Sequence, residues 1–187
     1  MVRFKMEKKL LIHVSSSVYL QQISRDGLRA MSYTKDDLRD CIARLLPHSN
    51  HDLLTEKVLS SKCAAASLVR SRVIDKKKGL AFMPEGFTEY YKNIVNCVKD
   101  GGEFFSAIRQ ALEFVTKSNI EKPYQNAYPI VCKVFFDVIN KTDGCQYLIH
   151  PVSRSQIRVP DSNRFEIFLD QPLPSNCFVI DYKPTLT

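Results

Sequence analysis

The fold class is decided by residues 128–139, YPIVCKVFFDVI, where β-branched and aromatic residues replace the helical patterns found earlier in the chain. Residues of these types favour extended strands. Three further segments of the same character follow, separated by Gly, Pro, Asn and Asp turns, at residues 146–150, 165–169 and 177–181. We therefore predict that the C-terminal third of the chain forms a sheet.

The part of the chain before this stretch has mostly helical spacing of its apolar residues. This spacing predicts helices over residues 34–46, 52–74, 87–98 and 104–115, and a short helix from about residue 17 that ends at Gly27. Two short apolar runs, residues 10–15 and 80–83, predict additional strands. Helices in the middle and strands elsewhere indicate an α+β fold rather than repeated βαβ units.

Length and composition bound the class of protein. The chain has 187 residues, 44% of them hydrophobic and 25% charged, which suits one globular domain over residues 1–187 and argues against a disordered chain. Its 27 Lys and Arg residues exceed its 20 Asp and Glu residues, for a formal charge of +7. Such an excess favours an anionic partner, which includes nucleotides, nucleic acids and acidic protein surfaces.

Targeting signals and metal ligands are not predicted. No apolar run approaches the roughly 18 residues of a membrane span, and residues 10–14 are too short for the core of a signal peptide. We therefore expect a soluble protein that is cytoplasmic or is delivered into a host cell without a Sec signal. The HxxH at residues 48–51 lacks a second ligand pair, so we predict no metal site. No CxxC occurs, so reduced thiols are predicted at Cys41, Cys63, Cys97, Cys132, Cys145 and Cys177.

Three short motifs, each beside a predicted strand, carry the functional signal. They are His13-x-Ser15 before a short helix that closes on Gly27-Leu28, Gly79-x-x-Phe82 before a helix with Tyr90 and Tyr91, and Glu166 at the head of a late strand. In this order they resemble the ADP-ribosyltransferase fold of bacterial mono-ADP-ribosylating toxins, poly-ADP-ribose polymerases and tRNA 2′-phosphotransferases, in its His-Tyr-Glu form. The resemblance implies that NAD is the substrate. It also implies two small antiparallel sheets that form a cleft, with helices of about residues 34–118 inserted between the strands.

The chemistry of NAD cleavage gives each motif residue a role. Breaking the bond between nicotinamide and ribose creates an oxocarbenium-like transition state, which the Glu166 carboxylate would stabilise. His13 and Ser15 at a strand end would hydrogen-bond the second ribose. A tyrosine ring would stack on the nicotinamide, and we rank Tyr91 before Tyr90. Each residue also has a structural alternative, since at least one tyrosine is expected in the core.

Further binding residues follow from the resemblance and from charge. Gly27 and Phe82 belong to the dinucleotide site, and Arg25 and Arg29 would meet the pyrophosphate. Members of the family that modify arginine carry Glu or Gln two residues before the catalytic glutamate, whereas here Arg164 occupies that position. We therefore expect an acceptor other than arginine.

The loop before Glu166 is expected to contact the acceptor. Its Arg154 and Arg158, followed by Arg164, favour an acidic or phosphate-bearing target.

The leading hypothesis is transfer of ADP-ribose from NAD to a protein acceptor by a bacterial effector or toxin, that is, a mono-ADP-ribosyltransferase. One alternative is a transferase of the same fold that acts on RNA or DNA, either removing a 2′-phosphate or modifying a base. The other is a basic domain without enzymatic activity that binds protein or nucleic acid.

Overall fold

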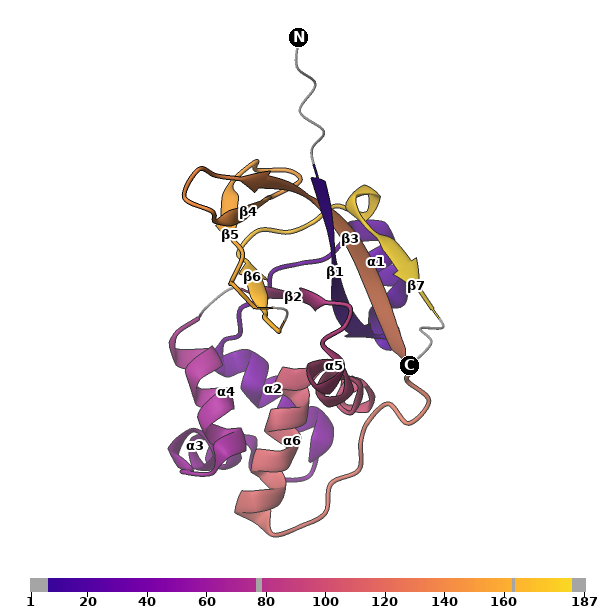
Figure 1. Ribbon diagram of the computed structural model, residues 1–187. Coiled ribbons are helices and arrows are strands. Elements are labelled where there is room, and N and C mark those ends of the chain that lie inside the picture. Colours follow the sequence, from indigo (N-terminus) through magenta and orange to yellow (C-terminus); the bar gives the residue numbers. More distant parts are fainter. Residues whose placement is uncertain (1–6, 77–78, 163, 183–187) are drawn as a thin grey trace.

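The computed structural model describes residues 7–76, 79–162 and 164–182, in which seven strands form one curled antiparallel sheet (Figure 1). The strands are β1 (Glu7–Ser16), β2 (Leu80–Pro84), β3 (Pro129–Asn140), β4 (Gln146–Ile149), β5 (Gln156–Arg158), β6 (Ile167–Leu169) and β7 (Val179–Asp181). Their order is β5-β4-β3-β1-β2-β6, and β7 pairs with β3. The α+β class predicted from the sequence is confirmed.

The sheet is continuous, where we expected two separate sheets. β1 and β3 pair along their length, from Glu7 opposite Val138 to Ser16 opposite Pro129. The next junction is short, because β1 meets β2 only at Leu11 opposite Pro84 and Ile12 opposite Met83. β2 then pairs with β6, which connects the last strand of the path to the rest of the sheet.

Side chains along β3 point alternately to the two faces of the sheet, so this strand contributes residues to both faces. One face packs into the main core together with Ile23 of α1 (Leu20–Asp26) and contributes Ile130, Cys132, Val134, Phe136 and Val138. The other face contributes Val131 to a smaller cluster with Tyr91 of α5 (Thr88–Val95). The two faces are therefore covered by different helices.

The remaining four helices form a unit of their own below the sheet in Figure 1. They are α2 (Lys35–Leu45), α3 (His51–Ser60), α4 (Ala64–Ile74) and α6 (Glu103–Thr116). Their apolar side chains make a separate core that includes Leu38, Ile42, Val58, Val69, Ile108 and Leu112. We call these four helices the helical unit.

The single helix predicted over residues 52–74 is wrong, because the structure divides it into α3 and α4. Ser61 and Cys63 are both extended, and the Cys63 Sγ accepts a hydrogen bond from the Ala66 N–H at 3.3 Å. The thiol thus acts as the N-cap of α4. Neither Gly nor Pro marks the break, which explains why helical spacing alone missed it.

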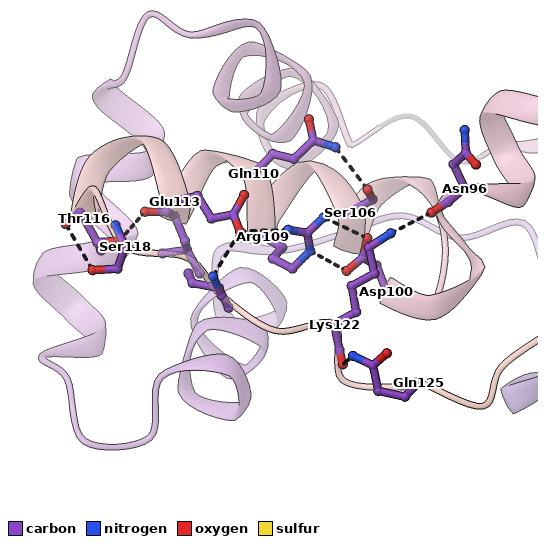
Figure 2. A network of polar contacts seen from close by, with 12 residues as sticks. Asn96, Asp100, Ser106, Arg109, Gln110, Glu113, Thr116, Ser118, Lys122 and Gln125 are labelled. Carbon is purple, nitrogen blue, oxygen red and sulfur yellow. Dashed lines mark hydrogen bonds and ion pairs between the residues drawn. The ribbon is translucent and has the colours of Figure 1, made fainter.

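A buried polar network joins the helical unit to the chain that returns to the sheet (Figure 2). Asp100, at the end of the 3₁₀ helix η2 (Val98–Asp100), accepts a 2.6 Å hydrogen bond from Arg109 Nε. Arg109 Nη1 donates to Glu113 Oε1 at 3.0 Å, and the same oxygen accepts from the Ile120 N–H at 3.0 Å. The network fixes α6 and therefore the position of its first residue.

Small differences from the predicted elements matter for the site. The strand predicted at 165–169 begins at Ile167, so Glu166 immediately precedes β6. The six cysteines are free thiols. Within the described ranges, no helix combines the length and apolar character that a membrane span requires.

Candidate active site

A cavity of about 970 Å³ lies between the sheet and the helical unit. The end of β1, α1 and β2 form one wall, α4 and the start of α6 form the other, and α5 contributes Tyr90. Pockets for small molecules generally measure about 300 to 1,000 Å³. The cavity is therefore large enough for a dinucleotide.

His13 presents one acceptor nitrogen for a ligand. Its Nδ1 lies 2.8 Å from the Ala81 carbonyl oxygen, and because a carbonyl only accepts, Nδ1 carries the hydrogen. Burial lowers the pKa of His13, which keeps the ring neutral and leaves Nε2 with a lone pair. Ser15, two residues along β1, also lines the cavity. The end of β1 therefore offers an imidazole acceptor and a hydroxyl.

Tyr90 lines the cavity and contacts Glu166, which is not itself among the lining residues. The Tyr90 hydroxyl donates a hydrogen bond to Glu166 Oε1, although the two residues lie 76 positions apart in the sequence. Burial is the main cause that raises the pKa of Glu166, and the hydrogen bond from Tyr90 opposes it. Burial also raises the pKa of Tyr90, as does its bond to Glu166. Tyr90 is consequently a neutral donor that orients a carboxylate.

Tyr91, which we ranked first, lies in the core. It is buried in the cluster formed by Ile12, Val14, Met83 and Val131, and it is not among the residues that line the cavity. Its hydroxyl has no hydrogen-bond partner among the described residues. Successive helical residues point about 100° apart, and in α5 this rotation turns Tyr90 to the cavity and Tyr91 into the core. The structure brings Tyr90, not Tyr91, to Glu166.

The other predicted binding residues divide into two groups. Gly27 and Arg29 line the cavity, although Arg29 Nη2 is already paired with Asp26 Oδ2 at 2.8 Å. Arg25 is not part of the lining; its side chain is 78% exposed and pairs with the same aspartate. Phe82 is fully buried beneath the His13 ring, with centroids 5.7 Å apart. It supports His13 and does not line the cavity.

Gly27 is required where α1 ends beside the C-terminal part of the chain. Its φ is +82°, and a Cβ at this position would lie 2.2 Å from the Leu173 carbonyl oxygen. Leu28 and Leu173 exchange backbone hydrogen bonds of 2.8 and 2.9 Å immediately next to it. The close approach holds α1 against the segment that follows β6.

Four charged residues that line the cavity were not predicted from the sequence: Arg72, Asp75, Glu103 and Asp170. Arg72 of α4 and Glu103 of α6 both line it, with Arg72 Nη2 3.3 Å from Glu103 Oε2. The charge of Arg72 lowers the pKa of both Glu166 and Tyr90, whereas Glu103 raises them, although neither is the main cause of those shifts. The helical unit therefore supplies two charged side chains that act on the pKa values of Tyr90 and Glu166.

The sequence held one signal for Glu103, the Gly101-Gly102 pair in front of it, which by itself is typical of a helix end. The same part of the cavity is aromatic: Tyr33 stacks on Phe104 with ring centroids 3.7 Å apart.

The arginines of the predicted acceptor loop lie outside the cavity lining. Arg154 Nη1 is 3.7 Å from an Asp137 carboxylate oxygen, and Arg164 Nη1 is 3.8 Å from Glu89 Oε2. Arg158 is exposed on β5. Two of the three positive charges thus have carboxylate partners within the protein.

Comparison with models of protein families, with curated proteins and with solved structures finds no match for this chain. Among the described residues no group of three or more His, Cys, Asp or Glu side chains is arranged to hold a metal ion. The ring of His51 instead contacts the Leu46 carbonyl oxygen, 3.0 Å from Nε2.

Proposed function

We propose that the protein is an NAD-dependent ADP-ribosyltransferase of the His-Tyr-Glu type that modifies a protein acceptor as a bacterial effector or toxin. The observation that carries this proposal is the meeting of three motifs at one cavity. His13 and Tyr90 line it, and Glu166 accepts a hydrogen bond from Tyr90. In this proposal the curled sheet and the inserted helical unit are a variant of the ADP-ribosyltransferase fold.

The proposed reaction breaks the bond between C1′ of the ribose and the nicotinamide nitrogen. The electron pair of that bond goes to the ring, which leaves as neutral nicotinamide. A nucleophilic atom of the acceptor then bonds to C1′ and releases its proton to solvent. Positive charge develops on the ribose in the transition state, and the ionised Glu166 carboxylate next to the sugar stabilises it.

The other residues bind and orient the dinucleotide. The free Nε2 of His13 accepts a hydrogen bond from a ribose hydroxyl, and Ser15 can donate or accept another. The Tyr90 ring stacks on the nicotinamide while its hydroxyl keeps the Glu166 carboxylate in place. Tyr90 takes the role that the sequence had assigned first to Tyr91.

Incubation with NAD labelled in its adenylate half tests both the activity and the acceptor. We expect the wild type to label protein in a lysate and Glu166→Gln to label none. Glu121→Gln is the matched control, because Glu121 carries the same charge, is exposed and does not line the cavity. Label on purified RNA or DNA in place of protein would move the proposal to a nucleic-acid acceptor. Failure of the wild type to consume NAD would leave a non-enzymatic binding domain.

A further inference from the structure

The Arg72–Glu103 ion pair has an unusual position for two charged residues of a helical unit. Both side chains line the cavity, and both are partly buried, with 34% and 40% of their side-chain surfaces exposed. Only one pair of atoms, Arg72 Nη2 and Glu103 Oε2, is in contact, at 3.3 Å. A guanidinium has five N–H donors, so Arg72 retains donors without a partner among the described residues.

The pair shares the cavity with two tyrosines. Tyr90, whose hydroxyl donates to Glu166, and Tyr33, which stacks on Phe104, both line it. Arg72 lowers the pKa of Tyr33 and of Tyr90, and Glu103 raises the pKa of both, while burial remains the main cause of each shift. The ion pair therefore lines the same cavity as both tyrosines, and its charges act on both of them.

We propose, on the basis of the function above, that oxidised NAD separates this ion pair: Arg72 binds the diphosphate and Glu103 faces the positively charged nicotinamide ring. The charges of the pair match those of the substrate, which carries an anionic diphosphate and a cationic ring. Arginine binds phosphate oxygens through parallel charge-assisted hydrogen bonds, which exceed a single long contact to a carboxylate.

Cleavage of NAD removes one of the two charges that would keep Arg72 and Glu103 apart. Nicotinamide leaves as a neutral molecule, so Glu103 loses the charge that it faced. Its carboxylate then competes with the diphosphate of the ADP-ribose product for Arg72. The ion pair thereby distinguishes NAD from its reduced form, whose ring is neutral, and from ADP-ribose.

Titration calorimetry with NAD, NADH and ADP-ribose tests this inference. All variants carry Glu166→Gln as well, so that NAD is not consumed. We expect Arg72→Gln to weaken binding of all three ligands by about tenfold or more. Glu103→Gln should weaken NAD binding about three- to tenfold and leave NADH and ADP-ribose bound at least as tightly as before. Arg70→Gln, a charge loss on the same helix outside the cavity lining, should change none of the three affinities.

Equal affinities for Arg72→Gln and Arg70→Gln would overturn the inference, as would equal weakening of NAD and NADH by Glu103→Gln. Arg72→Lys and Glu103→Asp keep the charges and should restore most of the affinity, which separates charge recognition from loss of folding. The two proposals fail in different ways. Binding of all three ligands without any effect of Arg72→Gln overturns only this inference, whereas absence of binding by Glu166→Gln and by the wild type overturns both.

Discussion

Helix α6 carries charged residues of two kinds, and they differ in how completely they are bonded. At Arg109 the network with Asp100 and Glu113 is closed: the Asp100 side chain is 1% exposed and that of Arg109 12%, and each carboxylate is hydrogen-bonded (Figure 2). At the start of the same helix Glu103 meets Arg72 through one 3.3 Å contact inside a cavity.

The difference separates structural charges from candidate functional ones. A buried polar network whose charged members are paired on several sides rigidifies the fold. Arg72 and Glu166 each make a single side-chain contact among the described residues and line or adjoin a cavity. Incomplete bonding at a cavity, rather than charge itself, is therefore the feature that marks the site.

Asp100→Asn should produce the largest effect, because it breaks the closed network. The substitution leaves the buried Arg109 guanidinium without its principal counter-ion, and we expect the free energy of unfolding to fall by about 3 kcal/mol. Urea denaturation measures this loss. Asp161→Asn changes an exposed aspartate and should stay within about 0.5 kcal/mol of the wild type. Equal losses in the two variants would mean that the network is not structural.

Gly27→Ala should have the next largest effect on stability, because the wall of the cavity depends on backbone packing at this position. The new Cβ would collide with the Leu173 carbonyl oxygen, and we expect a loss of stability of about 2 kcal/mol or more. Gly144 has a similar φ of +79° with open space around it, so Gly144→Ala isolates the backbone strain. Gly27→Ala should unfold at a clearly lower temperature than Gly144→Ala, and the reverse order would contradict the collision with Leu173.

Tyr90→Phe and Tyr91→Phe compare two neighbouring hydroxyls, of which the first lies at the cavity and the second in the core. Tyr90→Phe removes the donor that orients Glu166, and we expect the rate of nicotinamide release to fall about tenfold. Tyr91→Phe removes a buried hydroxyl without a described partner, so activity should stay the same and stability should not fall. A larger loss of activity in Tyr91→Phe would return the catalytic role to Tyr91.

The smallest expected effect is the change that Glu166→Gln makes to the dependence of stability on pH. Burial raises the pKa of Glu166 in the folded state above its unfolded value. The folded protein therefore holds the proton over a pH range in which the unfolded chain has lost it, and wild-type stability falls as pH rises through that range. The variant, which stays neutral, should unfold at a higher temperature than the wild type at pH 7. The difference should disappear below about pH 4, and a variant less stable at pH 7 would contradict the sign.

The sequence was sufficient for most of the elements and for part of the site. The strand and helix periods located β1 with His13 near its end, and a late strand at residues 165–169 that the structure starts one residue after Glu166. These residues are recognisable because each belongs to a local pattern. The β5 strand was missed because three residues are too short to show a period.

The rest of the site depends on packing between distant elements. Arg72 and Glu103 lie 31 residues apart on helices whose exposed charges look like any solvated face, and only the fold brings them together. The choice between Tyr90 and Tyr91 needed the rotation of α5 against β1 and β2, which the helical spacing did not determine. Contacts of this kind leave no signal in a single sequence.

The most direct measurement of the central claim is the release of nicotinamide from NAD, followed by chromatography, for the wild type and for Glu166→Gln. Circular dichroism of both proteins confirms that each is folded. We predict release by the wild type and a rate at least about 100-fold lower in the variant, because the charge that stabilises the transition state is lost. Release by both proteins at the same rate, or no release by the wild type above buffer, would contradict the assignment of Glu166 and its cavity as the catalytic site.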